Sequence, residues 1–471
     1  MIRWQRSHAC DAVRESFISR AAFPVFAWGL AFHSLVMAAL FGLFGLPEGV
    51  VRALAAWKEI ALVLLLVIIT VRALAGHGNG VIVTWADLFI GGLIAIAVCY
   101  LLAENLWLRA NLPRDAELLG VRDAVYFMLT YFIGRASPSL LSDDAGMRRL
   151  FTLVLFTCIL GVIERIFVTP EMLVALGVAS YFQEFLGVAA FTAGNEYGLP
   201  LNYWTMIGGQ PFRRAGSVYL GGQGFAIPFL LFFPLATAWV FARAKRTKWQ
   251  IASYAVICAA LALTLTRMTI LIAFVQLALF VALLRRPEWA VAGLAFGASV
   301  FAVAMLVIPG FPMFVWQTLS WQEGSSVSHV NDWMKGALVF VERPWGSGLG
   351  TTDQTAIRAG LAPLTADNLY LKYGVEMGAI GLILIVLVLI AIGGTGLKLL
   401  REGNESQRRM GITLWLATIG IAINGITAVV FNSITLGWLF FWLAGAAVSN
   451  AYPAPAIRRV RARLLGDPSP A

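Results

Sequence analysis

The sequence predicts an all-α protein whose helices cross a membrane about twelve times. Three observations support this fold class: 59% of the 471 residues are hydrophobic, only 13% are charged, and long apolar stretches recur from Phe23 to Ala447. Soluble domains carry roughly 25% charged residues. Each apolar stretch is long enough to cross a hydrocarbon layer of about 30 Å as a helix, which excludes a water-soluble fold.

The expected spans divide the chain into one membrane domain with two short ends. They cover residues 22–44, 53–73, 82–103, 118–135, 149–168, 218–241, 251–266, 268–284, 289–309, 373–397, 411–430 and 433–450. The membrane domain is therefore residues 22–450. The segment before it, 1–21, is charged and has no short apolar core or cleavage site, so we expect the first span to be retained. The tail, 451–471, is rich in Pro and Ala and is expected to be disordered.

Basic residues predict the side of the membrane on which each connection lies. They gather in the N-terminal segment, in several connections and in the tail, and they alternate with turns that hold few of them. Because such clusters stay in the cytoplasm, an even number of spans places both termini there. This topology also explains the net charge of +10, so no nucleic-acid partner is expected. The four cysteines form no CxxC pair, and we expect neither a disulfide framework, nor a metal site, nor a cofactor.

Two connections, residues 169–217 and 310–372, are much longer than the others, and the parity of the spans places both on the outer face. Long connections in a compact membrane bundle usually carry function. We therefore expect the chemistry of the protein at the outer face. The alternative is that both segments are structural caps that hold the bundle closed.

Arginines mark the first candidate site. Arg213 and Arg214 end the first long connection and precede a glycine-rich stretch. Guanidinium groups and glycine N–H groups suit the oxygens of a diphosphate. Arg267 lies in a tight turn between two spans, where a charged side chain is costly unless it is paired or functional. The alternatives are that the arginine pair extends to lipid headgroups and that Arg267 bonds the carbonyls of its own turn.

The second candidate site lies where the second long connection leads into the tenth span. Asp367 is at the predicted N-cap, Glu376 follows about two and a half turns later, and Gly378 and Gly381 allow close helix packing. A carboxylate here suits a general base that activates a hydroxyl nucleophile, and simple N-capping is the alternative. His329, in the same connection, is either a further candidate base or a surface residue.

These segments, in this order, resemble the bacterial O-antigen ligase and polysaccharide polymerase superfamily of integral membrane glycosyltransferases. The ligase pattern at the tenth span is His, then Asn, Ser or Gln, nine residues, and Gly-x-x-Gly. Asn368, Gly378 and Gly381 match this pattern, whereas Asp367 stands where the His is expected. Three further segments are similar to the other motifs of the family: Arg214–Gly216, Thr266–Arg267 and Pro344–Gly350.

The resemblance implies a GT-C-like helical bundle with a periplasmic cavity, in the inner membrane of a bacterium. Such enzymes take a glycan from an undecaprenyl-diphosphate carrier and attach it to a hydroxyl of an acceptor glycan, without a metal. Other polysaccharide-assembly proteins are further possible partners. Arg214 and Arg267, with Arg213 beside them, would bind the leaving diphosphate. The departure at Asp367 leaves three candidate bases, namely Asp367, His329 and Glu376.

The same departure favours a polymerase of O-antigen or exopolysaccharide repeats over a lipid A-core ligase. Two other classes of function are kept as alternatives. A transporter or flippase of lipid-linked oligosaccharides would use ionisable residues across the bilayer, and the sequence offers Asp87 without an evident relay. A non-catalytic scaffold of a secretion complex would tolerate the loss of all these polar motifs.

Overall fold

The computed structural model describes residues 18–75, 82–108, 112–141, 144–191, 197–207, 210–242, 247–284, 305–306, 310–320, 324–365 and 367–453. Within these residues the chain is helical almost throughout, and the predicted all-α fold class is confirmed. The described strands form one antiparallel hairpin of β1 (Trp204–Ile207) and β2 (Gln210–Arg213). Most of the predicted span 289–309, and most of the predicted N-terminal segment and tail, lie outside the described residues.

Seven stretches within the described residues are long and apolar enough to cross a membrane as helices. They comprise α2 (Phe23–Ala38) with its flanking turns, α3 (Glu48–Ala55) with α4 (Trp57–Leu74), α5 (Trp85–Trp107), α8 (Asp144–Phe167), α11 (Gly222–Ala226) with α12 (Phe229–Phe241), α19 (Leu369–Glu402) and α21 (Ile434–Ala451). Two shorter apolar helices, α13 (Lys248–Leu263) and α14 (Arg267–Leu284), also belong to the bundle, as does α20 (Glu405–Asn424).

The predicted count of twelve spans is not confirmed, and the predicted span 118–135 differs most clearly from the structure. It is split into α6 (Arg114–Val125), a 3-10 turn at Tyr126–Leu129, and α7 (Thr130–Arg135). At Val125 the backbone leaves the helical region, with φ of −135° and ψ of −14°. Summed hydropathy does not register such a change of backbone, so the sequence pattern here resembles one continuous helix.

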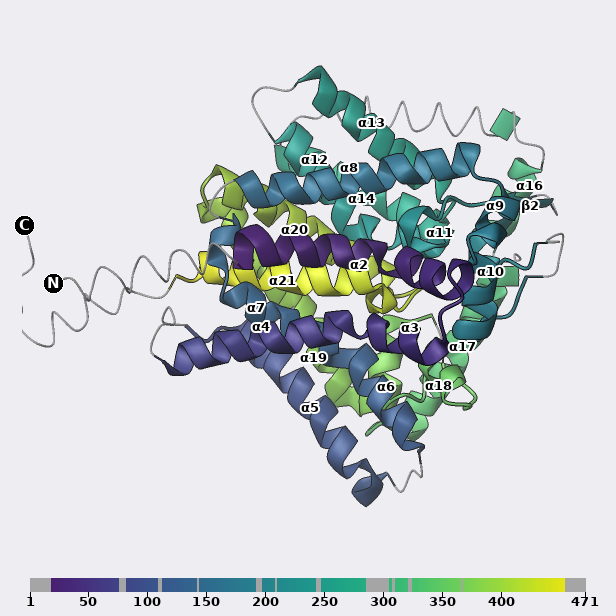
Figure 1. The fold of residues 1–471 in the computed structure, drawn as a ribbon. Helices are drawn as coiled ribbons and strands as arrows, with labels where there is room; N and C mark the ends of the chain where they lie inside the picture. The colour runs from purple at the N-terminus through teal and green to yellow at the C-terminus, as the bar shows by residue number, and fades with distance from the viewer. Residues whose placement is uncertain are drawn as a thin grey trace, which may run out of the picture.

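The centre of the bundle is α21, which lies among α2, α7, α19 and α20 (Figure 1). Its closest neighbour is α7, and glycines make that approach possible. A Cβ on Gly134 of α7 or on Gly445 of α21 would overlap the backbone of the other helix. Small residues allow such backbone contact in membrane bundles, where dispersion forces rather than hydrophobic burial drive helix association.

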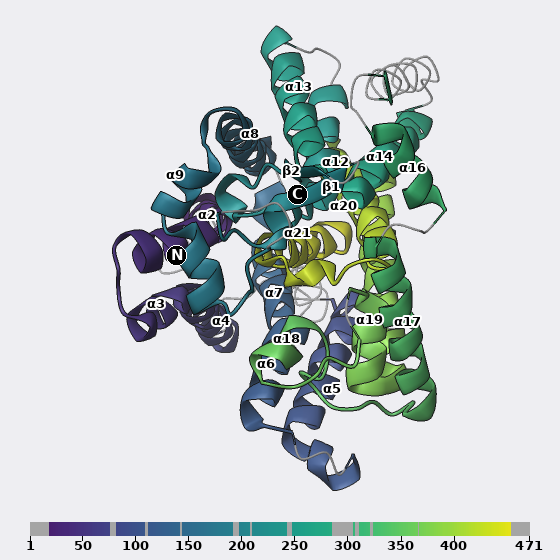
Figure 2. The same cartoon turned by 90° about the vertical axis from the view of Figure 1, so that its right-hand side faces the viewer.

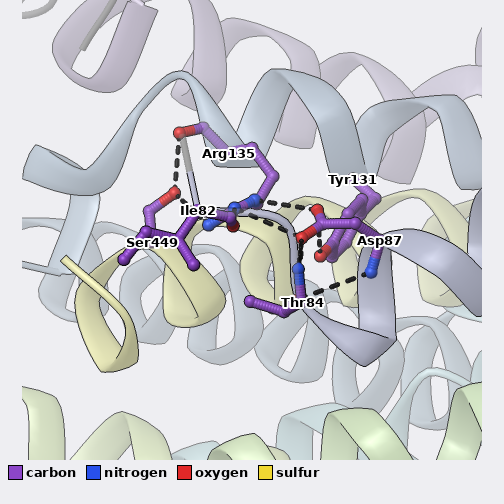
Figure 3. A network of polar contacts seen from close by, with 6 residues as sticks. All are labelled: Ile82, Thr84, Asp87, Tyr131, Arg135 and Ser449. Carbon is purple, nitrogen blue, oxygen red and sulfur yellow. Dashed lines mark hydrogen bonds and ion pairs between the residues drawn. The ribbon is translucent and has the colours of Figure 1, made fainter. Parts of the chain in front are cut away.

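A buried ion pair ties three helices together near the end of α21 (Figure 3). Arg135 of α7 donates from Nε to Asp87 of α5 at 3.0 Å and from a terminal nitrogen to the Ile82 carbonyl at 2.7 Å. The hydroxyl of Tyr131 donates to the same carboxylate at 2.8 Å, and Ser449 of α21 donates to the Arg135 carbonyl at 2.7 Å. A buried charge pair is tolerated when its partners are satisfied in this way. The network gives Asp87 a structural role.

The two long connections lie at the same end of the bundle, opposite the start of α2 and the end of α21 (Figure 1). The first contains α9 (Pro170–Ala175), α10 (Val178–Ser180) and the hairpin, and the second contains α16 (Phe311–Leu319), α17 (Gly324–Glu342) and α18 (Asp353–Arg358). Burial raises the pKa of Tyr181, in the first connection, to about 12 against the positive charge of Arg358 in the second. The side chains of Tyr181 and Arg358 are thus near enough to interact electrostatically.

Figure 2 looks onto this end of the molecule. The hairpin lies on the side of α12 and α14, whereas α17 and α18 lie on the side of α19, α5 and α6. The two connections thus cover different parts of the same end. Which side of the membrane this end faces stays a prediction.

Helix α19 is interrupted at Gly378, whose φ of 70° and ψ of −167° lie outside the helical region. The turn Pro344–Gly350 packs into this break and replaces helical hydrogen bonds that the break removes. Three such bonds join the turn to the helix, from Ser347 N–H to the Val375 carbonyl (2.6 Å), from Gly348 N–H to the Glu376 carbonyl (3.2 Å), and from Ala379 N–H to the Pro344 carbonyl (2.8 Å).

Glycine is required on both sides of this contact. A Cβ on Gly378 would lie 2.6 Å from the carbonyl oxygen of Pro344, and its positive φ disfavours any other residue. Gly350, with φ of 77°, packs against the backbone of α6 at Ala116, so the turn is held between α6 and α19. The Gly-x-x-Gly pattern at Gly378 and Gly381 and the glycine-rich turn Pro344–Gly350 are therefore two halves of one structural feature.

We predict that Gly378→Ala destabilises the protein, because the left-handed conformation alone costs about 1–3 kcal/mol and the Cβ would also displace the turn. Gly394→Ala is the matched control in the same helix, since a Cβ there meets no atom within 4 Å and alanine favours a helix. Thermal unfolding of the purified full-length proteins in detergent measures the difference. Equal melting temperatures for the two variants would contradict the structural role of the break.

Candidate active site at one end of the bundle

The cap of α19 is Asn368. Its side-chain oxygen accepts a hydrogen bond from Leu371 N–H at 2.9 Å, and its amide nitrogen donates to the Ile426 carbonyl at 2.9 Å. The residue therefore joins the start of α19 to the end of α20. The predicted N-cap role of Asp367 is wrong, because the next residue fills it. The carboxylate of Asp367 is thereby left for another role.

Asp367 faces His329, which lies on α17 in the same long connection. The carboxylate oxygen Oδ2 is 3.6 Å from the imidazole Nδ1. About half of the Asp367 side chain (50%) and a quarter of the His329 side chain (27%) are exposed, so a substrate can reach both. The Trp333 ring, one turn later on α17, stacks on the imidazole with centroids 6.2 Å apart. Two of the three predicted candidate bases thus lie side by side.

Glu376, the third candidate base, is completely buried. The Thr352 hydroxyl donates to its Oε1 at 2.5 Å, and the Lys372 ammonium is 3.9 Å from the same oxygen. A general base must come within hydrogen-bond reach of the proton that it removes. The position of Glu376 therefore does not support a role as the base, and its contacts are those of a structural carboxylate.

The ammonium of Lys372 also lies 3.4 Å from Oδ2 of Asp353, the first residue of α18. The other carboxylate oxygen of Asp353 accepts a hydrogen bond from Asp367 N–H at 3.2 Å. Asp353 and Lys372 are both buried, with side chains 6% and 1% exposed. A buried ionic cluster thus lies directly beneath the exposed pair of Asp367 and His329.

The surroundings of Asp367 favour its protonated form. Desolvation raises the pKa of this carboxyl, the negative charges of Asp353 and Asp332 raise it further, and the imidazole of His329 opposes the rise. The backbone of Asp367 is also strained, with φ of 54°. Strained residues outside glycine cluster at functional sites, so this conformation supports the assignment of a site here.

Arg214 and Arg267 come together at the turn between α13 and α14. Arg214 donates from Nε to the Thr264 carbonyl at 2.8 Å and from a terminal nitrogen to the Thr266 hydroxyl. Burial and the positive charge of Arg267 lower the pKa of Arg214 to about 10. Gly222, at the start of α11, leaves the space that the Arg214 side chain occupies. The desolvated guanidinium of Arg214 thus lies at the turn that carries Arg267, and two positive charges at one turn are suited to an anion.

Arg213, the third predicted arginine, points elsewhere. Its terminal nitrogens contact the Glu164 carboxylate at 3.2 Å and the carbonyls of Glu164 and Arg165 at 3.1 and 2.9 Å. The second oxygen of Glu164 accepts the N–H groups of Gly216 and Ser217. Arg213 therefore holds the end of the hairpin against α8, and this placement supports a structural role rather than anion binding.

The arginine cluster (Arg214 and Arg267) and the cluster around Asp367 lie at a similar depth along the axis of the bundle. Gln276 of α14 donates to the Leu416 carbonyl of α20 at 3.0 Å, and these helices run antiparallel. Arg267 is nine residues before Gln276 and Gly425 is nine residues after Leu416, so both lie about 14 Å further along the axes in the same direction. Gly425 accepts the Leu369 N–H at the start of α19. The turn that carries Arg267 and the start of α19 therefore lie at a similar depth along the bundle.

Sequence reasoning missed Asp353, Lys372 and Thr352. Lys372 and Glu376 are four residues apart in an otherwise apolar helix, and this spacing was a readable signal of a buried pair. Asp353 carried no such signal, because its partners lie 14 and 19 residues away. Within the described residues, no group of three or more His, Cys, Asp or Glu side chains is suited to hold a metal ion.

Comparison with known proteins finds one family to which part of this chain is similar. The O-antigen ligase family profile matches residues 252–386. The matched segment includes Arg267, His329, Asp367 and the break at Gly378, whereas Arg214 precedes it. No curated protein matches the sequence significantly. The profile match confirms the predicted resemblance, and residues 252–386 are an O-antigen ligase-like segment of a multi-pass membrane protein.

Proposed function

We propose that the protein is a glycosyltransferase that transfers or polymerises glycans carried on undecaprenyl diphosphate. The observation that carries this proposal is the hydrogen bond from Arg214 to the Thr266 hydroxyl, next to Arg267, at the end of the bundle where the two long connections lie. A diphosphate bound at this turn would be attracted by both positive charges. The same charges would then stabilise the leaving group as negative charge develops on it.

The pair of His329 and Asp367 is the proposed catalytic base. With His329 Nδ1–H directed to the Asp367 carboxylate, Nε2 is left to take the proton of an acceptor hydroxyl. The hydroxyl oxygen then forms a bond to the anomeric carbon of the donor sugar, and the bond from that carbon to the diphosphate oxygen breaks with its electron pair. The diphosphate leaves against Arg214 and Arg267. No metal is needed for this sequence of steps, in keeping with a GT-C-type enzyme.

The remaining assignments follow from the resemblance and the topology. We place the protein in the inner membrane of a bacterium, with both termini in the cytoplasm and the active end in the periplasm. Residues 22–450 act as one membrane domain. Because the histidine of the ligase pattern is replaced by Asp367 and a histidine comes from α17 instead, we favour a polymerase of O-antigen or exopolysaccharide repeats over a ligase.

Arg214 and Arg267 form the proposed diphosphate clamp, and the loss of either residue is expected to slow the reaction strongly. Arg214→Ala and Arg267→Ala should each lower the rate of polymer formation by roughly 100-fold, because each removes a charge that stabilises the leaving diphosphate. Arg52→Ala is the matched control, since Arg52 lies exposed on α3, paired with Glu48. Polymer is measured in a deletion strain that carries each variant at equal membrane level. Normal polymer from both clamp variants would refute the clamp.

The loss of activity caused by removing His329 is expected to be partly compensated by the substitution Asp367→His. His329→Ala should lower the rate by about 100-fold, as expected for loss of a general base. The double variant His329→Ala/Asp367→His restores the histidine of the ligase pattern, and we expect it to recover part of the activity. The variant Lys335→Ala, at an exposed position of the same helix, is the control and should keep its activity. Full activity of His329→Ala would exclude His329 as the base.

The location of accumulated intermediates separates this enzyme from a transporter. Loss of a glycosyltransferase at the outer face leaves carrier-linked repeats on the outer leaflet. Loss of a flippase leaves them on the inner leaflet. Labelling of the lipid-linked glycan in intact spheroplasts of the deletion strain with a membrane-impermeant reagent measures this location, and accumulation on the inner leaflet would favour the transporter.

A further inference from the structure

We infer that Asp353 and Lys372 are positioning residues, which fix the backbone of Asp367 and thereby the direction in which its carboxylate faces His329. This inference rests on the proposed function. It assigns a role to a buried ionic cluster that the clamp and the base do not use. The evidence is the set of contacts that leads from the buried lysine to the exposed pair.

The lysine and two carboxylates form a closed ring. Lys372 lies 3.4 Å from Asp353 and 3.9 Å from Glu376, and Glu376 in turn accepts the Thr352 hydroxyl at 2.5 Å. Thr352 directly precedes Asp353 in the chain, which completes the ring. Because all four side chains are buried, none can turn away without leaving a partner unsatisfied. Asp353 therefore has a fixed position and a fixed orientation.

One oxygen of Asp353 is directed out of this ring. Its Oδ1 accepts the Asp367 N–H at 3.2 Å while its Oδ2 faces the lysine. Asp367 has φ of 54°, and Asp353 itself has φ of 53°. Aspartate tolerates such left-handed conformations better than most residues, but they remain uncommon and are stabilised by local contacts. The hydrogen bond from Asp367 to Asp353 supplies such a contact at the residue whose side chain meets the imidazole.

The helix that carries His329 is attached to the same segment. Asp353 N–H donates to the Thr365 carbonyl at 3.0 Å, and Leu364 N–H donates to the Thr351 carbonyl at 3.0 Å. These two hydrogen bonds join the two segments of the loop. The Thr365 hydroxyl then donates to the Asp332 carbonyl of α17 at 3.1 Å. Both members of the proposed base are thus held in place by one buried cluster.

The cluster also affects the charge of Asp367. The charged groups that face this carboxylate are His329 and Asp332 of α17 and Asp353 of α18, with Lys372 of α19 behind Asp353. The negative charge of Asp353 raises the pKa of Asp367. If the reaction needs Asp367 ionised, activity is lost as the pH falls through that pKa. Neutralising Asp353 lowers the pKa and therefore moves the acidic limb of the pH profile to lower pH.

Two variants distinguish the positioning role of Asp353 from the effect of its negative charge. Asp353→Ala removes both the acceptor of the Asp367 N–H and the charge, and we expect the rate to fall by about 30-fold or more. The variant Asp353→Asn removes the charge, keeps an oxygen acceptor for the Asp367 N–H, and leaves Lys372 beside Glu376. We expect a clearly smaller loss of rate than in Asp353→Ala, with the acidic limb at lower pH. Polymer formation is measured against external pH in right-side-out vesicles of the deletion strain, which contain the accumulated lipid-linked glycan.

A rate for Asp353→Ala equal to wild type would overturn the inference. Equal losses in the two variants with an unshifted acidic limb would also overturn it, because a merely structural residue would give that result. Membrane levels and melting temperatures identify a variant that does not fold. Arg214→Ala is assayed in parallel. If Arg214→Ala keeps its activity, the proposed function is refuted. If Arg214→Ala is inactive while Asp353→Ala stays active, only the positioning role is refuted.

Discussion

The structure depends on the satisfaction of backbone polar groups where α19 is interrupted. An apolar bundle offers no water to an unpaired carbonyl or N–H group, so a helix can break there only if another segment supplies the missing partners. The turn Pro344–Gly350 supplies them at Gly378. That contact fixes where the second long connection returns to the bundle, and thus where α17 and α18 lie relative to the start of α19.

Charge pairing follows the same principle at both ends of the molecule. Arg135 and Asp87 satisfy each other between α7 and α5, and Lys372 is satisfied by two carboxylates beneath the surface. Arg214 differs, because it lies beside another cation and bonds neutral oxygens of the turn. Arg213, its neighbour in the chain, pairs with the Glu164 carboxylate instead. The difference between these two neighbouring residues is what directs the functional interpretation to Arg214.

Much of this arrangement was accessible from sequence, and the remainder depended on long-range contacts. Hydropathy predicted the helical class, and the spacing of Asn368, Gly378 and Gly381 indicated a special start of α19. Hydropathy did not predict the split between α6 and α7, because local backbone angles at Val125 decide it. The approach of His329 to Asp367 was not predictable either, since 37 residues separate them and no periodicity links α17 to the loop before α19.

The break at Gly378 also explains why a fixed number of residues separates the two parts of the α19 motif. Nine residues lie between Asn368 and Gly378, and in a helix each one adds about 1.5 Å of rise and about 100° of rotation. One inserted or deleted residue would turn Asn368 away from α20 while Gly378 stayed in its turn. A point substitution in this stretch alters the contacts of one side chain, whereas a change of length would displace every contact on one side of it. The length of the spacer therefore constrains the motif in addition to the buried residues that the spacer contains.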